Sequence, residues 1–194
     1  PRPFGKLRIG GATVREIALH VLDLMENSVA AGAQRVLVRV VQNRATDQLE
    51  IAVEDDGCGL PDTVQDAAHP VFTTKPGKRT GLGLSLFREA AERAGGDLHL
   101  CASPWGGTAV RVRMRLLHID RMPLGDLAAT VGAMACTAPE VDFSCEVEVD
   151  GKKETVSTQQ LRAATGQGPG QNLLVMRQMT NQIRKGLEGL GALP

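Results

Sequence analysis

Apolar residues near the start of the chain recur three or four positions apart, the spacing of a helix that buries one face. They are Val14, Ile17, Ala18, Val21, Leu24, Met25 and Val29. Thr13 with Glu16 three residues later has the form of a capping box, so we expect the helix to begin at Thr13. Gly32 is expected to end it, because glycine readily adopts the left-handed conformation that closes many helices.

A polar face accompanies this apolar one. His20, Asp23 and Asn27 share one side of the predicted helix, because residues three, four and seven positions apart lie above one another. Asp and Asn are poor helix formers, and here they stand beside apolar neighbours. The pattern is compatible with a solvated flank or with a functional face, and the helix alone does not separate the two.

Alternation of apolar and polar residues predicts four strands further along the chain. They are expected at residues 35–41, 49–54, 97–103 and 110–116. In the last of them Arg111, Arg113 and Arg115 alternate with apolar residues, which indicates a strand with one face in water. A helix is expected from Leu82 to Arg93. Helices on one face of a mixed sheet whose other face is exposed make a two-layer α/β sandwich of the α+β kind.

The composition changes after Leu117, and we therefore divide the chain into a domain over residues 13–117 and an accessory α+β segment over 118–194. The elements expected in the segment are a linker at 118–125, a helix at 126–136, a hairpin of strands 143–149 and 152–157, and helices at 158–164 and 171–187. On the last helix Met176, Met179 and Ile183 form an apolar stripe, which indicates either core packing or the seam of a homodimer.

Charge and cysteine usage exclude some classes of protein. The 194 residues carry 22 basic and 22 acidic side chains, so neither nucleic acid nor an anionic membrane is the expected partner. No apolar run reaches the ~18 residues that span a bilayer, and the first residues lack the apolar core of a signal peptide. The four cysteines show no CxxC spacing and are expected to be reduced thiols, which points to the cytoplasm.

The candidate chemistry lies between Asp55 and Leu86. Asp55-Asp56-Gly57-Cys58-Gly59 follows a predicted strand, and Gly81-Leu82-Gly83 opens a predicted helix. Glycines let backbone N–H groups approach a ligand, and a helix N-terminus favours negative charge. The irregular residues 61–80 between them have the length of a lid or binding loop. Together these features indicate a nucleotide site.

Four blocks, in the right order, resemble the motifs of the gyrase/Hsp90/histidine-kinase/MutL superfamily of ATP-binding domains. Asp23-Leu24-Met25-Glu26-Asn27-Ser28 resembles its N box, and Asp55 to Gly59 resembles its G1 box. Phe72-Thr73-Thr74-Lys75-Pro76 and Thr80-Gly81-Leu82-Gly83-Leu84-Ser85 resemble the F and G2 boxes of sensor histidine kinases. The resemblance covers about residues 13–117 and implies the Bergerat form of the α/β sandwich.

The resemblance implies ATP and Mg²⁺ as ligands. Asp55 would accept a hydrogen bond from the adenine amino group, and Asn27 would hold Mg²⁺ through its side-chain oxygen. Gly81 and Gly83 would offer backbone donors to phosphates that Lys75 neutralises. The full set of expected nucleotide-binding residues is Asp55, Gly57, Gly59, Phe72, Thr73, Thr74, Lys75, Thr80, Gly81, Leu82, Gly83, Leu84 and Thr108.

The reaction is left open by a departure from the family pattern. Transmitter kinases of the family carry a separate phosphoacceptor helix, which has no counterpart here, and His20 within the nucleotide helix is a poor candidate acceptor. Four residues before Asn27, hydrolysing members carry Glu and many kinases carry Asn, whereas this chain carries Asp23. A carboxylate there can act as a general base.

Three functions follow as alternatives. The first is an ATPase or nucleotide switch with Asp23 as the catalytic residue. The second is a protein kinase acting in trans, like anti-sigma serine kinases or split histidine kinases, on an unidentified phosphoacceptor. The third is an adaptor that binds ATP or ADP without turnover and serves a protein partner.

Overall fold

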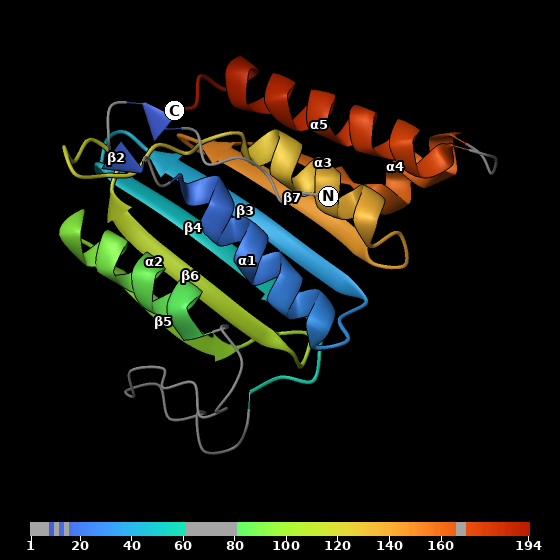
Figure 1. Ribbon diagram of the computed structural model, residues 1–194. Helices are drawn as coiled ribbons and strands as arrows, with labels where there is room; N and C mark the ends of the chain where they lie inside the picture. The colour runs from blue at the N-terminus through green and yellow to red at the C-terminus, as the bar shows by residue number, and fades with distance from the viewer. Residues whose placement is uncertain (1–7, 10–11, 14–15, 61–80, 166–169) are drawn as a thin grey trace.

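The computed structural model describes most of the chain, with the exception of five stretches. The described residues are 8–9, 12–13, 16–60, 81–165 and 170–194. They form one six-stranded mixed sheet in the order β5-β6-β4-β3-β7-β8 (Figure 1). The strands are β3 (Arg35–Asn43), β4 (Gln48–Asp55), β5 (Asp97–Ala102), β6 (Thr108–Arg115), β7 (Asp142–Val149) and β8 (Lys152–Ser157). The β3–β7 pair is parallel and the other four pairs are antiparallel.

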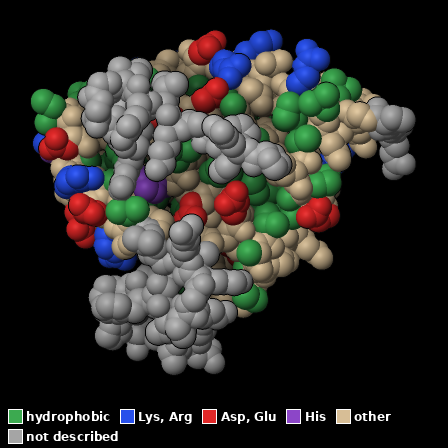
Figure 2. Space-filling model, in the orientation of Figure 1, with side chains coloured by type: hydrophobic (Ala, Val, Ile, Leu, Met, Phe, Trp, Pro, Cys, Tyr) green, Lys and Arg blue, Asp and Glu red, His purple; other side chains and the backbone are tan. Residues whose placement is uncertain are grey.

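In the described part of the chain five helices pack on one face of the sheet, and two strands of two residues each precede the first helix (Figure 1). The helices are α1 (Ile17–Ala30), α2 (Gly81–Arg93), α3 (Leu127–Thr137), α4 (Thr158–Thr165) and α5 (Gln171–Gly189), and the short strands are β1 (Arg8–Ile9) and β2 (Ala12–Thr13). The expected two-layer α/β sandwich with a mixed sheet is confirmed. On the helix-covered side of the molecule acidic and basic side chains are interspersed, in keeping with the balanced charge (Figure 2).

Helix α1 begins later than the capping-box pattern predicts. Thr13 belongs to β2, and the N-cap residue is Glu16, whose side chain makes no capping hydrogen bond. The capping box is therefore wrong. The linker provides the hydrogen-bond acceptors for the start of the helix instead. The amides of Ile17 and Ala18 donate to the carbonyls of Pro123 and Leu124 at 2.9 and 3.0 Å.

The other end of α1 closes as expected, at Gly32 with φ of +76°. The Gly32 amide donates to the Val29 carbonyl at 3.0 Å, and the Ala33 amide donates to the Ser28 carbonyl at 3.1 Å. These two bonds are the Schellman arrangement, which needs a residue in the left-handed region. The turn directs the chain straight into β3.

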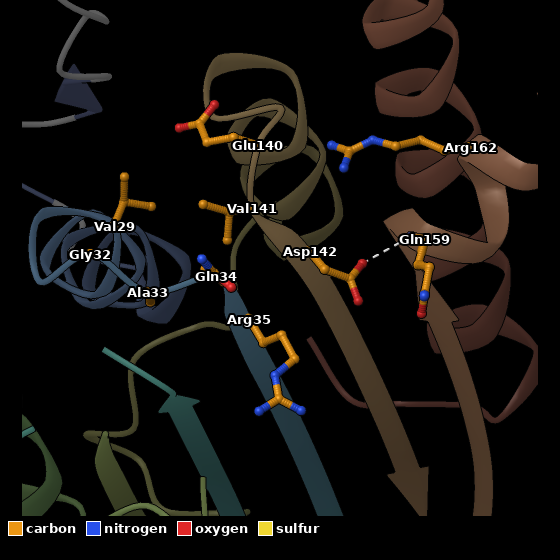
Figure 3. A pocket seen from close by; sticks show the side chains of 10 residues that line it. All are labelled: Val29, Gly32, Ala33, Gln34, Arg35, Glu140, Val141, Asp142, Gln159 and Arg162. Carbon is orange, nitrogen blue, oxygen red and sulfur yellow. Dashed lines mark hydrogen bonds between the residues drawn. The ribbon is translucent and has the colours of Figure 1, made fainter. Parts of the chain in front are cut away.

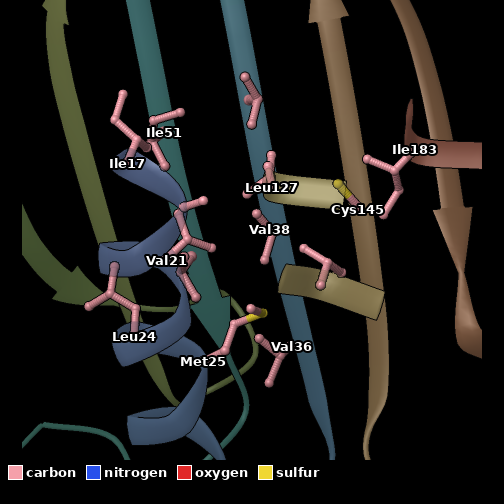
Figure 4. Packing of buried hydrophobic residues seen from close by; sticks show 14 of the residues in the cluster. Ile17, Val21, Leu24, Met25, Val36, Val38, Ile51, Leu127, Cys145 and Ile183 are labelled. Carbon is pink, nitrogen blue, oxygen red and sulfur yellow. The ribbon is translucent and has the colours of Figure 1, made fainter. Parts of the chain in front are cut away.

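A single core joins the beginning and the end of the chain (Figure 4). Helix α1 contributes Ile17, Val21 and Met25, which are buried against Val36 and Val38 of β3 and their neighbours. Residues beyond 117 supply the other half of the same cluster, among them Leu127, Phe143, Val175, Met179 and Ile183. Met179 and Ile183 of the last helix are therefore core residues in this chain, which is one of the two roles their stripe allowed.

The face of the sheet opposite the helices carries ion pairs between neighbouring strands. On β6, Arg111 pairs with Glu54 at 3.0 Å, and Arg113 pairs with Glu50 at 2.8 Å. Arg115 pairs with Asp47, in the β3–β4 turn, at 2.8 Å. The prediction that one face of this strand contacts water is confirmed, since Arg113 and Arg115 are exposed.

The C-terminal residues lie against a buried side chain of β3. Gln42 is 1% exposed, and its amide nitrogen donates to the Leu193 carbonyl at 2.9 Å. Its amide oxygen accepts from the Leu193 backbone N–H at 2.7 Å. Among the described helices, none has the length and apolar character needed to cross a membrane.

Candidate functional site

A pocket of about 220 Å³ opens at the ends of β4 and β6, between α1 and α2. Its walls are largely apolar and are formed by Leu24, Ala31, Val53, Leu60, Leu84, Leu100 and Val110. Its polar groups come from α1 and from the strand ends, and they are Asn27, Ser28, Asp55 and Thr108. An apolar slot with a few convergent polar groups fits a flat heterocycle whose edge carries hydrogen-bonding atoms.

Asp55 is the polar anchor of this pocket. It ends β4, is 5% exposed, and accepts three hydrogen bonds from the described residues. Oδ2 accepts from the Ser28 hydroxyl at 2.7 Å, and Oδ1 accepts from the amides of Gly57 and Thr108 at 3.0 Å each. A carboxylate offers about four acceptor positions. One position on Oδ2 is therefore left for a donor in the pocket.

Glycines allow the backbone to close around Asp55. A Cβ at Gly107 would overlap the Asp55 carboxylate and carbonyl, and at Gly57 it would lie 3.0 Å from Ala31. Gly59 has φ of +71°, and a Cβ there would lie 2.9 Å from the Gly106 carbonyl oxygen. The strand end and the β5–β6 turn can approach this closely only because these positions lack side chains.

Asp23 and Asn27 lie on α1 with the spacing of one helical turn, so they share a face. The Asn27 side chain lines the pocket, and its amide makes no hydrogen bond to another described side chain or backbone group. Asp23 lies against the first turn of α2, where a Cβ at Gly83 would overlap its carboxylate. Burial raises the pKa of Asp23 above the ordinary value of an aspartate.

The structure brings together a large part of the expected site. Asp55, Gly57, Gly59 and Thr108 surround one end of the pocket, and Asn27 and Leu84 line it. Gly81, Leu82 and Gly83 form the first turn of α2, next to Asp23. The expected residues Phe72, Thr73, Thr74, Lys75 and Thr80 lie outside the described part of the chain.

Sequence reasoning assigned no role to Ser28, which holds Asp55 at 2.7 Å, or to Gly107. The signal for both was present in the sequence. Ser28 follows Asn27 directly in the first motif, and Gly107 precedes Thr108 in the glycine turn. Neither position by itself shows that its partner is Asp55, because the contact joins segments that lie far apart in the sequence.

Two histidines that the sequence offered for chemistry have structural surroundings. His20 stacks on Phe87 of α2, with ring centroids 4.6 Å apart and planes 4° from parallel. His118 accepts a hydrogen bond from the Asp120 amide at 3.1 Å, as in an ordinary turn. Within the described ranges no three side chains of His, Cys, Asp or Glu are grouped so as to hold a metal ion.

Comparison with known families and relatives gives a consistent result. Residues 13–118, just over half of the chain, match the family model described as histidine kinase-, DNA gyrase B-, and HSP90-like ATPase. The sensor-type histidine kinase PrrB of Mycobacterium leprae is 35% identical over 102 residues, which cover 50% of this chain and 22% of that protein. The virulence sensor protein BvgS of Bordetella bronchiseptica is 26% identical over 155 residues, covering 75% of this chain and 12% of that protein. This chain thus spans under a quarter of the length of these relatives.

Solved structures extend the comparison. The ATP binding domain of PrrB from Mycobacterium tuberculosis is 31% identical with a TM-score of 0.38, and covers 50% of this chain and 64% of that one. The MutL ATPase domain of Aquifex aeolicus, complexed with ADP, is 16% identical with a TM-score of 0.42, and covers 86% of this chain and 70% of that one.

Proposed function

Because the chain belongs to the histidine kinase-, DNA gyrase B-, and HSP90-like ATPase family, we propose that it binds Mg-ATP in the pocket around Asp55 and acts as an ATPase or nucleotide switch. The observation that carries this proposal is the state of Asp55. Three donors among the described residues hold its carboxylate in place, and the same carboxylate lines an apolar slot. A buried carboxylate directed into such a slot calls for an amino donor on a flat ligand.

Adenine satisfies this requirement. Its exocyclic amino group would donate to Asp55 Oδ2, while its faces would pack against the apolar side chains Leu24, Leu84 and Leu100. Guanine and hypoxanthine carry a carbonyl oxygen where adenine carries the amino group. That oxygen would meet the carboxylate as a second acceptor, and the pair would repel.

The phosphates would extend along α1 toward the first turn of α2. The backbone N–H groups at the start of a helix have no intrahelical partners and attract anions. Gly83 lets the Asp23 carboxylate lie directly against that turn, and Gly81 begins it. In this proposal Lys75, Phe72, Thr73, Thr74 and Thr80 complete the phosphate end of the site.

Asn27 fits the role of the magnesium ligand. Its amide oxygen is a hard ligand at the pocket wall, and no described side chain competes for it. When bound, the ion would neutralise phosphate charge. Asp23, one turn away, would take the proton from an attacking water. Its raised pKa brings its basicity closer to that of a base working near neutral pH.

A titration calorimeter can test the nucleotide assignment with ATP and ITP, which differ at the adenine amino group. Because a hydrogen bond to a charged group is worth ~1.5–3 kcal/mol, ATP should bind about tenfold more tightly or better. Asp55→Leu should abolish binding of both nucleotides. Asp56→Asn is the control and should retain binding, because this neighbouring carboxylate bonds to Gln34 and Arg35. Equal affinities of the wild-type chain for ATP and ITP would contradict the proposal.

A kinase acting in trans is the second candidate function. It is favoured by the resemblance of residues 72–85 to sensor-kinase motifs and by the similarity to PrrB, a histidine kinase. Phosphate release and phosphoryl transfer to candidate proteins, measured side by side, separate it from hydrolysis. Binding without turnover in either assay would favour the adaptor. In each case we place the chain in the cytoplasm, with an unidentified protein partner or a second copy of itself.

A further inference from the structure

A second and larger pocket, of about 830 Å³, lies where the family-matched part of the chain meets the residues beyond it (Figure 3). The end of α1 and the start of β3 form one wall, with Val29, Gly32 and Arg35. The α3–β7 loop and α4 form the other wall, with Asp142 and Arg162 among its residues. This pocket shares no lining residue with the one around Asp55.

Arg162 is the unusual group in this pocket. Its side chain extends from α4 toward the α3–β7 loop (Figure 3). One guanidinium nitrogen, Nη2, is fully buried and has no hydrogen-bond partner among the described residues. A buried donor without a partner destabilises the fold, and more so when it is charged. The cost is removed when the Arg162 side chain turns toward the pocket and a ligand there supplies an acceptor oxygen.

The other arginine of the pocket is already paired. Arg35 donates through Nε to Asp56 at 2.9 Å, and its guanidinium lies over the Trp105 ring at 5.0 Å from the centroid. By contrast, Arg162 forms no ion pair with any described carboxylate. The pocket therefore lacks a hydrogen-bond acceptor for Arg162.

Two carboxylates on the same wall restrict the charge of the ligand. Asp142 Oδ1 accepts from the Thr158 hydroxyl at 2.7 Å and from the Gln159 amide at 2.9 Å, which leaves Oδ2 for a further donor. Glu140 is exposed at the rim. A phosphate dianion would be repelled by both groups, whereas a carboxylate with an attached amino or amide donor matches Arg162 and Asp142 together.

We propose that this pocket binds a small ligand that carries a carboxylate together with an amino or amide donor, an amino acid or a short peptide in chemical class. Arg162 holds the carboxylate, and Asp142 accepts from the donor. The proposal does not depend on nucleotide binding, because the two pockets are separate.

Nuclear magnetic resonance of the nitrogen-labelled 194-residue chain tests this proposal with three probes: glycylglycine, acetate and inorganic phosphate. Glycylglycine should give saturable shifts of the Gln34, Val141 and Gln159 amides, which line the pocket. Acetate should bind more weakly, and phosphate more weakly still. Arg162→Gln should reduce the glycylglycine affinity about tenfold or more, because a charge-assisted pair is lost.

Arg177→Gln is the matched control, since Arg177 is exposed on α5 and does not line the pocket. It should leave the titration unchanged. Arg162→Lys, which keeps the charge but not the fork of donors, should fall between wild type and Arg162→Gln. The proposal is overturned by any of three results: no saturable shifts in the wild type, unchanged binding in a folded Arg162→Gln variant, or phosphate binding as tightly as glycylglycine.

Discussion

At the scale of single residues, the site depends on carboxylates in unequal surroundings. Asp55 has its charge satisfied by three donors, whereas Asp23 is half-buried and its pKa is raised because burial disfavours the ion. A carboxylate such as Asp23, whose charged form is disfavoured by burial, destabilises the fold and is suited to accept a proton. Active-site residues commonly show this conflict between stability and activity.

Asp23→Asn should separate the two effects. It should abolish ATP turnover, a loss of 10²–10⁴-fold or more for a general base, and leave ATP affinity close to that of the wild type. Because the folded pKa of Asp23 is raised, ionisation destabilises the fold above the unfolded pKa of ~3.9, and the neutral amide removes that penalty. The variant should therefore be more stable than the wild type at pH 7 and equal to it below about pH 3.

Phosphate-release assays and thermal unfolding across pH measure both parts of this prediction. Glu26→Gln is the control, since Glu26 is an exposed carboxylate on the same helix. Turnover that survives in Asp23→Asn would remove Asp23 as the base and favour transfer to histidine, an intrinsically nucleophilic acceptor.

At the scale of elements, the short connection between α1 and β3 is held by Asp56. Its Oδ1 accepts from the amides of Gln34 and Arg35, both at 2.8 Å, and its Oδ2 accepts from Arg35 Nε. Burial acts to raise the pKa of Asp56, but the hydrogen bonds from Arg35 and Gln34 outweigh it, so the pKa is lowered. The helix of Asp23 and Asn27 is thereby fixed to the strand that adjoins Asp55.

Asp56→Asn should destabilise the fold by about 1–2 kcal/mol at pH 7, since charge-assisted bonds are lost at a partly buried carboxylate whose partner Arg35 is exposed. With a lowered folded pKa, this stabilisation is present above the unfolded pKa of ~3.9 and is lost as the pH falls through the folded value. The difference between variant and wild type should therefore shrink below pH 4. Urea unfolding at pH 7 and pH 3 measures it, with Glu92→Gln, an exposed residue of α2, as control. A difference that persists unchanged at pH 3 would contradict this account.

Elements with strong periodicity could be predicted from the sequence, and their ends less so. The strand expected at 35–41 is β3, Arg35–Asn43, and the helix expected at 126–136 is α3, Leu127–Thr137. The predicted start of α1 was wrong because carbonyls some hundred residues away accept the hydrogen bonds of its first amides. A local sequence pattern shows the helix or strand propensity of a segment and which of its faces is buried. It does not show a hydrogen-bond partner that a distant segment supplies.

At the scale of the whole molecule, the residues beyond the family match complete the sheet. Strand β7 pairs with β3 along its length, from Arg35 opposite Asp142 to Gln42 opposite Val149. The sequence predicted strand 143–149 as part of a separate hairpin, because its alternation does not show which strand it will join. For the same reason the contacts of Ser28 and Gly107 with Asp55 could not be read from the sequence. The division of the chain at residue 117 stays a prediction about function. The six-stranded sheet and the hydrophobic core both contain residues from each side of it.

The contact between Gln42 and Leu193 ties the last residues to the centre of the fold. Deletion of residues 191–194 should cost about 1–3 kcal/mol of unfolding free energy, because the buried Gln42 amide loses both partners. The same deletion should cost less in a Gln42→Leu background, where no buried amide remains to be satisfied. Urea unfolding of the four chains gives the coupling. Equal costs in both backgrounds would show that the amide contact does not stabilise the fold.

The parallel pairing of β3 with β7 also has a consequence for how the chain folds as it leaves the ribosome. Strand β3 is followed at once by its antiparallel neighbour β4, but its other partner is synthesised about a hundred residues later. At a synthesis rate of ~5–20 residues per second, the edge of the Val-rich strand β3 that pairs with β7 stays unpaired for on the order of 5–20 s. An unpaired edge of this kind can recruit strands of other chains. Nascent chains should therefore be most prone to aggregate, and most dependent on chaperones, between the emergence of β3 and that of β7.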